Sequence, residues 1–334
     1  MKKISVLIMI LLTISCKNNK NKPSFNEDGK KQISLKEIDS FLTSRAVKDS
    51  LNGVILIADN DEVLFKKAYG FKDLSHTEKH SLESKIGLAS MPKMFTAIAI
   101  IKLAKSGEIK LNNTVGNYLP EIKNQFLKDS VTIRQLLSHT SGLGNYWDYT
   151  NESDQEDLDK LYHLIVMNDS LKSHRKFRYS NSGFIVLGKI IESVSKVPYN
   201  EFVENNILTP LSMNNTQSVL PDGGSSSTVD DLMKFSKALR NFELISKSDF
   251  DDMITKQSDA NYGLGFQLND KNDKEIYGHP GGYFEENTTL GVASAMDIID
   301  NRYTVIVLTN RNPSMGGVNA RNFILNDLTK QLSE

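Results

Sequence analysis

Three short motifs in this sequence bring together residue types that can perform acyl transfer. Ser90 and Lys93 form an S-x-x-K pair, Tyr179 and Asn181 form a Y-x-N element, and residues 278–282 read Gly-His-Pro-Gly-Gly. On the first turn of a helix, the S-x-x-K spacing places both side chains on one face, with the serine at the positive helix end. A serine hydroxyl becomes a nucleophile beside a base, and a partly desolvated lysine can serve as that base.

The other two motifs supply partners for this pair. A tyrosine beside a lysine can take and return a proton, while an asparagine amide can hold the lysine and a substrate carbonyl. The glycines of residues 278–282 let a substrate lie close to the backbone, where a free N–H could complete an oxyanion hole. The combination therefore indicates a nucleophilic serine hydrolase.

Each motif is weak by itself, because the same spacings recur elsewhere. Ser173 and Ser193 also stand three residues before a lysine, and Tyr149 opens a second Y-x-N. Ser90 differs in its context, since it ends an apolar stretch and opens a long apolar helix. Ser193 is predicted to lie inside a helix instead.

Taken together, the motifs resemble the class C β-lactamase-like serine hydrolases of the β-lactamase and penicillin-binding-protein superfamily. In that family, Y-x-N and H-x-G stand for the S-D-N and K-T-G of other branches. The resemblance runs from about residue 34 to residue 331 and keeps the family's order. Its longer matching stretches are 95–100, 131–142, 179–192, 210–213, 227–232 and 262–265.

This resemblance implies a catalytic role for four side chains. Ser90 would be the acylated nucleophile, and Lys93 and Tyr179 would be the proton-transfer pair. Asn181 would position both Lys93 and the substrate. One departure lies just before Tyr179, where residues 173–178 read SHRKFR in place of the family's usual Pro-Gly turn.

The resemblance also implies that residues 278–282 bind the substrate. His279 would take the place of the lysine in K-T-G, Gly281 and Gly282 would line the substrate and oxyanion region, and the N–H groups of Ser90 and Gly282 would form the oxyanion hole. Pro280 replaces a residue that supplies a hydroxyl in β-lactamases, so we expect poor penicillin and cephalosporin hydrolysis and a preference for uncharged esters or amides. Because the unperturbed pKa of histidine is near 6.5, we also expect carboxylate substrates to gain turnover relative to neutral ones as the pH falls toward 6.

Strand patterns at both ends of the chain and helices between them indicate how these motifs are positioned. Residues 53–58 and 63–69 read as a hairpin, residues 91–106 as a helix, and four later stretches as strands. We expect an α/β (α+β) fold with a central antiparallel sheet flanked by helices and a mostly helical insertion, which is the β-lactamase/transpeptidase-like fold. The expected bounds are 33–89 and 215–334 for the sheet part and 90–214 for the helical part, within a catalytic domain of 33–334. The four later strands are 262–268, 275–278, 290–295 and 303–309.

The first residues read as an export signal. Two lysines precede an apolar run over 4–14, which is too short for the roughly 20 residues that a spanning helix needs. Residues 13–16 (TISC) resemble the bacterial lipoprotein cleavage box, and Cys16 is the sole cysteine of the chain. The alternative is a plain secretory signal with an incidental cysteine, but lipidation would leave no free thiol in an oxidising compartment. We therefore predict a signal peptide over 1–15, a polar tether over 16–32, and a lipid anchor on Cys16 that holds the protein to a membrane of the bacterial cell envelope.

The composition of the chain limits which kinds of partner are expected. The 334 residues are 39% hydrophobic and 24% charged, which is ordinary for a globular protein, and the net charge of −1 leaves no basic footprint for nucleic acid. His76 and His80 do not form a metal motif, so neither a metal nor another cofactor is expected. The expected partner is a small-molecule or peptide substrate, and the oligomeric state stays open.

Two functions remain after these arguments. The first is an enzyme that hydrolyses an amide or ester through an acyl-serine intermediate. The second is a non-catalytic lipoprotein that binds cell-wall peptides or senses β-lactams in the same cleft. Within the first, D-aminopeptidase, D,D-carboxypeptidase, esterase and weak β-lactamase share the core residues, so the sequence does not choose among them.

Overall fold

A computed structural model describes residues 33–48, 51–148, 157–168, 176–284, 288–312 and 315–334. Residues Leu35–Glu334 form one compact unit. The predicted signal peptide, the tether and Cys16 lie outside the described residues. Among the helices of the described ranges, none is long and apolar enough to span a bilayer.

A six-stranded antiparallel sheet forms the centre of the Leu35–Glu334 unit. Its strands are β1 (Gly53–Asp59), β2 (Glu62–Tyr69), β5 (Gln267–Lys271), β6 (Lys274–Phe284), β7 (Gly291–Ile299) and β8 (Tyr303–Thr309). They follow the order β2-β1-β8-β7-β6-β5, and β1 pairs with β8 along its whole length. Strands from both ends of the chain therefore complete one sheet, as predicted. A separate pair joins β3 (Ile86–Gly87) to β4 (Ser226–Ser227).

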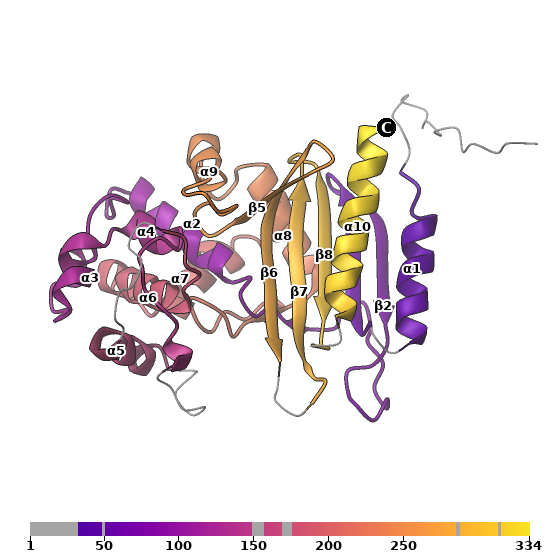
Figure 1. The fold of residues 1–334 in the computed structure, drawn as a ribbon, viewed down its shortest axis with the longest axis horizontal. Coiled ribbons are helices and arrows are strands. Elements are labelled where there is room, and N and C mark those ends of the chain that lie inside the picture. Colours follow the sequence, from indigo (N-terminus) through magenta and orange to yellow (C-terminus); the bar gives the residue numbers. More distant parts are fainter. Residues whose placement is uncertain (1–32, 49–50, 149–156, 169–175, 285–287, 313–314) are drawn as a thin grey trace, which may run out of the picture. The chain divides into compact units, whose positions relative to one another are not determined.

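Helices cover both faces of this sheet, which explains why all seven residues of β8 are buried. On one face, Ile306 and Leu308 of β8 join the main core together with Phe235 of α8 (Val229–Arg240). On the other face, α10 (Gly316–Ser333) packs against β7 and β8, and Figure 1 shows it lying along the strands beside α1 (Lys36–Val47). Side chains of a strand alternate between faces, so β8 is apolar except at Thr304 and Thr309, whose hydroxyls hydrogen-bond to Ser236 and to the carbonyl of Ala293.

The central helix of the helical part is α2 (Lys93–Lys105), which the sequence predicted over 91–106. Ten of its thirteen residues are buried, as expected of a helix that is apolar on every side. It contacts β6 of the sheet and α6 and α7 of the helical part. The helices grouped around it in Figure 1 are α3 (Gln125–Ser130), α4 (Ile133–Leu137), α5 (Leu158–Asn168), α6 (Asn181–Ser195), α7 (Tyr199–Val203) and α9 (Lys247–Met253).

Two strand predictions near the site are wrong in their bounds. The strand expected over 262–268 begins only at Gln267, because Gly265 has a left-handed φ of 78° and packs against α2, where an added Cβ would lie 2.4 Å from the Cβ of Ala97. The strand expected over 275–278 continues through Pro280 to Phe284 as β6. The pairing of β5 stops at Gly278, and a proline is tolerated where one side of a strand lacks a partner.

Candidate active site

Ser90 lies in the turn that leads into α2, and Lys93 is the first residue of that helix. The turn is tight: Ala89 has a left-handed φ of 47°, a conformation that costs a non-glycine residue roughly 1–3 kcal/mol. A distant part of the chain supports this turn, since the N–H of Leu88 donates to the carbonyl of Ser225 over 2.8 Å. The local sequence thus presents Ser90 at the helix start, as its spacing to Lys93 predicted.

Lys93 is fully buried and held by two oxygen acceptors. Its Nζ lies 2.7 Å from Oδ1 of Asn181 and 2.7 Å from the backbone carbonyl oxygen of Asp222. The centroids of the Tyr179 and Phe184 rings lie 5.1 and 5.5 Å, respectively, from the same Nζ. Two of the three donor positions of the ammonium are therefore used, and aromatic faces offset part of the cost of burying it.

Ser180, the middle residue of the Y-x-N element, fixes the position of this element through its hydrogen bonds. Ser180 is the N-cap of α6: its Oγ accepts the N–H of Gly183 and donates to the carbonyl of Gly144 over 2.7 Å. Its own N–H donates to Nδ1 of the buried His139 over 3.1 Å. These bonds fix the chain direction on both sides of Ser180, so Tyr179 precedes the helix and Asn181 opens it.

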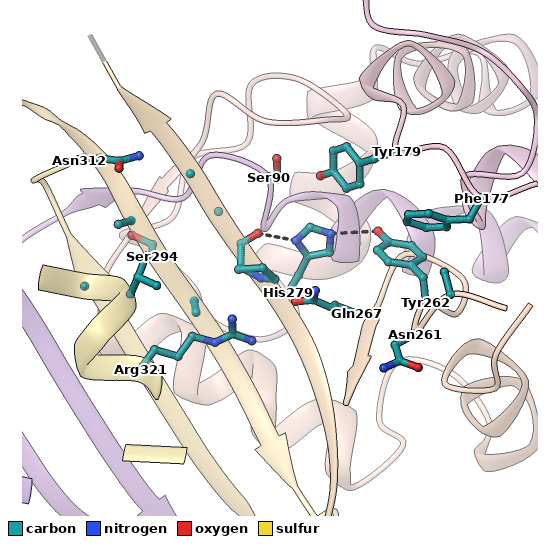
Figure 2. Close-up of a pocket in the computed structure, with 18 residues that line it drawn as sticks. Ser90, Phe177, Tyr179, Asn261, Tyr262, Gln267, His279, Ser294, Asn312 and Arg321 are labelled. Atoms are coloured by element: carbon teal, nitrogen blue, oxygen red, sulfur yellow. Dashed lines mark hydrogen bonds between the residues drawn. The ribbon is translucent and has the colours of Figure 1, made fainter. Parts of the chain in front are cut away.

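Aromatic rings surround Tyr179. The ring of His139 lies 4.3 Å from that of Tyr179 and 4.6 Å from that of Tyr262. Burial, together with the charge of Lys93, holds the pKa of His139 well below its ordinary value, so this ring is neutral at pH 7. The side chain of His139 is fully buried among these rings. Figure 2 shows the hydroxyl of Tyr179 pointing toward Ser90.

His279 lies in β6 beside these residues, but it does not offer a titratable charge to a substrate. The side chain is buried, and its Nδ1 contacts the carbonyl oxygen of Pro280 while Nε2 lies 2.9 Å from the hydroxyl of Tyr262 (Figure 2). A carbonyl can only accept, so Nδ1 carries the proton and Nε2 accepts from Tyr262. Burial and the charge of Lys93 lower the pKa of His279 to about 3. The expected gain of carboxylate turnover through His279 protonation near pH 6 is therefore wrong.

Gly281 and Gly282 of β6 differ in how closely they approach Ser90. A Cβ added to Gly281 would lie 1.9 Å from the carbonyl oxygen of Leu88 and 3.0 Å from the backbone nitrogen of Ser90. For Gly282 the nearest atoms would be 3.9 Å away. The absence of a side chain at Gly281 thus lets β6 run directly against the turn that holds Ser90. The assignment of the Ser90 and Gly282 N–H groups to an oxyanion hole stays a prediction.

Ser90 and Gly282 line two cavities of about 520 Å³ each. The first, called here the Tyr179 cavity, is also lined by Tyr179, His279 and Arg321. Arg321 comes from α10, and its guanidinium forms a two-pronged ion pair with the buried Asp297, with N–O distances of 2.6 and 2.7 Å.

The second cavity, called here the Asp222 cavity, is also lined by Asn181, Asp222, Tyr146 and Trp147. Tyr146 and Trp147 stack with ring centroids 5.1 Å apart, so they both line a cavity and form a local aromatic cluster. The third aromatic residue of that stretch, Tyr149, lies outside the described residues.

Sequence reasoning missed Asp222 and Arg321. Neither belongs to a motif, and each reaches the site from an element far away in the chain, so no local signal marked them. It correctly set aside Ser193, which lies inside α6 with its Oγ donating to the carbonyl of Tyr118 over 2.8 Å. The predicted residues that the structure gathers around the two cavities are Ser90, Lys93, Tyr179, Asn181, His279, Gly281 and Gly282.

The chain is similar to known proteins in its sequence and in its fold. Penicillin-binding protein 4* of Bacillus subtilis (strain 168) is 27% identical over 337 residues, covering 84% of this chain and 73% of the relative. Protein flp of Staphylococcus aureus (strain NCTC 8325 / PS 47) is 36% identical over 192 residues, which are 55% of this chain but only 38% of that relative. A solved D-amino acid amidase from Ochrobactrum anthropi SV3 shares the fold, with a TM-score of 0.72 at 18% identity over 90% of this chain and 100% of the amidase. Residues 42–329 match the family model described as Beta-lactamase, and the chain belongs to that family.

Proposed function

We propose that this protein is a serine hydrolase that cleaves an amide or an ester through an acyl-serine intermediate. The observation that carries the proposal is that the hydroxyl of Tyr179 points toward Ser90, while the buried Nζ of Lys93 lies 5.1 Å from the centroid of the Tyr179 ring and Ser90 lines two cavities. Membership of the Beta-lactamase family and the shared fold of a D-amino acid amidase support hydrolysis of this type.

Acylation begins when Oγ of Ser90 attacks the substrate carbonyl carbon and its proton passes to the Tyr179–Lys93 pair. The carbonyl oxygen becomes an oxyanion, which the N–H groups of Ser90 and Gly282 stabilise. The carbon–nitrogen or carbon–oxygen bond then breaks, and the same pair returns the proton to the leaving group. Asn181 holds Lys93 in position throughout, because its amide oxygen accepts from Nζ.

Deacylation repeats this chemistry with water. The Tyr179–Lys93 pair takes a proton from water, and the hydroxide attacks the acyl carbon of the ester on Ser90. Collapse of the second oxyanion breaks the bond to Oγ, and the proton returns to Ser90. The net reaction adds one water and releases an acid together with an amine or an alcohol.

We propose that esters and amides without a carboxylate are preferred to penicillins and cephalosporins. Pro280 supplies neither a side-chain hydroxyl nor an N–H, and the neutral ring of His279 supplies no charge for a ring carboxylate. The guanidinium of Arg321 is already paired with Asp297, so a carboxylate in the Tyr179 cavity would have to compete with that partner.

Active-site labelling followed over time tests the proposal. A fluorophosphonate and a fluorescent penicillin should label the protein, and a panel of esters, D-amino-acid amides and cephalosporins should identify turnover. Ser90→Ala should abolish both labelling and turnover, while Ser193→Ala serves as a matched control that keeps them. An undiminished rate in Ser90→Ala would end the proposal; no labelling supports the non-catalytic binder, and permanent labelling without turnover supports a sensor.

We further infer that the protein is exported and anchored to a membrane of the bacterial cell envelope through a lipid on Cys16. The inference rests on the charged start, the short apolar run and the TISC box. A single acyl chain anchors weakly, but the several chains of a mature lipoprotein anchor firmly. Its test is the cysteine substitution described below.

A further inference from the structure

The carboxyl group of Asp222 is buried without a full set of partners. The residue is 4% exposed, and its Oδ2 accepts a hydrogen bond from the hydroxyl of Tyr146 over 2.9 Å. Its Oδ1 is buried with no hydrogen-bond partner among the described residues. A buried carboxyl oxygen left in this way is costly, and such a group in a folded protein calls for a ligand or another explanation. Burial also raises the pKa of Asp222, although the charge of Lys93 and the hydrogen bond from Tyr146 act in the opposite direction.

The surroundings of this carboxyl are suited to a cation. Asp222 is the one acidic residue among the described residues that line the Asp222 cavity, and no lysine or arginine lines it. The stacked rings of Tyr146 and Trp147 form part of the wall, and Tyr283 of β6 forms another part. Aromatic faces beside a carboxylate attract an ammonium group more strongly than either feature alone.

The geometry also assigns the two cavities to the two sides of the scissile bond. Tyr179 lines only one of the two cavities that meet at Ser90. The leaving group must receive its proton from the Tyr179–Lys93 pair, so it belongs in the Tyr179 cavity. The acyl part of the substrate is then left to occupy the Asp222 cavity. Gly223, next to Asp222, lies within contact distance of the turn before Ser90, since its Cβ would be 3.1 Å from the carbonyl oxygen of Ala89.

We infer that Asp222 forms an ammonium subsite for the acyl part of the substrate. The preferred substrates are then amides or esters of amino acids that carry a free amino group. This inference rests on the proposed hydrolysis at Ser90, because it uses Tyr179 to assign the leaving-group side.

A purely supporting role for Asp222 makes a different prediction. Its backbone carbonyl accepts from Lys93, and its charge lies close enough to interact with that ammonium. If this were the whole role of the side chain, losing the carboxylate would slow every substrate by the same factor. An ammonium subsite instead changes the ratio between substrates with and without the amino group.

A matched pair of substrates measures that ratio. Phenylalanine p-nitroanilide, in both D and L forms, and its desamino counterpart 3-phenylpropionyl p-nitroanilide differ only in the amino group, which is mostly protonated at pH 6.5. We expect wild-type kcat/KM to favour the amino substrate, and Asp222→Asn to lower this preference on the order of tenfold to a hundredfold. Asp251→Asn, which removes an exposed charge paired with Lys247, is the control and should keep the preference. An equal loss for both substrates in Asp222→Asn would overturn the subsite.

Equilibrium binding separates this inference from the proposed function. In Ser90→Ala, which cannot be acylated, calorimetry should show that phenylalanine amide binds more tightly than 3-phenylpropionamide, and that adding Asp222→Asn removes the difference. If wild type turns over no substrate but this difference is found, the hydrolase proposal fails and the subsite stands. If both amides bind Ser90→Ala equally, the subsite is refuted whatever the enzyme hydrolyses.

Discussion

Replacing His279 by glutamine should reduce the loss of stability that the protein suffers on acidification. The buried ring stays neutral in the folded protein because its pKa is lowered to about 3, whereas an unfolded histidine titrates near 6.5. The unfolded chain therefore binds more protons at this position below about pH 6.5. Folding stability must fall as the pH drops through the window from about 6.5 toward 3.

The size of the effect follows from these two pKa values. At pH 7 the unfolded histidine is mostly neutral, and at pH 5 it is almost fully protonated while the folded ring is not. The free energy of unfolding should therefore fall by about 2 kcal/mol between pH 7 and pH 5 on account of His279 alone. The pKa of His139 is lowered as well and adds a loss of the same sign, while the raised pKa of Asp222 acts in the opposite direction.

Urea unfolding of wild type and His279→Gln at pH 7 and pH 5 measures this contribution. A glutamine amide offers the donor that the Pro280 carbonyl needs and the acceptor that the Tyr262 hydroxyl needs, without titrating. The loss between the two pH values should be about 2 kcal/mol smaller in the variant, and His163→Gln, at an exposed position on α5, should lose as much as wild type. Equal losses in wild type and His279→Gln would show that the ring is protonated in the folded protein and that the hydrogen-bond assignment is incorrect.

Three further predictions concern catalysis and anchoring. Gly281→Ala should lower turnover of every substrate by more than about a hundredfold or destabilise the fold by about 1–3 kcal/mol, because its Cβ would lie 1.9 Å from a backbone oxygen. Turnover by Gly282→Ala should stay within about tenfold of wild type. Steady-state kinetics and urea unfolding compare the two variants, and equal effects would contradict the close approach of Gly281. Lys93→Ala and Tyr179→Phe should each slow acylation by several orders of magnitude with non-additive effects in stopped-flow labelling, and a double variant that lost the full sum would refute a shared proton path. Cys16→Ser should move the protein from the membrane fraction to the soluble or precursor pool in an immunoblot, and unchanged membrane association would refute lipidation.

The parts of the site that sequence reasoning predicted are those whose geometry is local. Ser90 and Lys93 belong to one helix start, and Tyr179 and Asn181 to another, so fixed spacings in the chain translate directly into positions in space. The N-caps Thr132 and Thr228 are local in the same way, since both side chains accept from the backbone N–H three residues on. The pairing of the two ends into one sheet was also predicted, since strand patterns stand at both ends of the chain.

The parts that were missed depend on contacts between distant elements. The left-handed turn at Gly265 exists because α2 presses against it, and β6 runs through Pro280 because β5 ends its pairing at Gly278. A histidine in a Gly-Pro-Gly context looks exposed and titratable, and only the packing of Tyr262 above it shows that it is neither. Burial of a polar residue is a property of the whole fold, so its pKa could not be predicted from the motif.

The contacts that position Ser90 differ in kind from the side chains that line the cavities. Ser90 is held by backbone contacts, from the left-handed Ala89 to the close approach of Gly281, and these contacts leave no space for substitution without moving Ser90. Asp222 and Arg321 reach the cavities as side chains from a loop and from α10, so their chemistry can change while the backbone around Ser90 stays in place. Changes at Gly281 should therefore affect all substrates alike, and changes at Asp222 should reorder them. The likeness to a penicillin-binding protein and to an amidase therefore does not identify the substrate, because backbone contacts position Ser90 and the cavity walls select what reaches it.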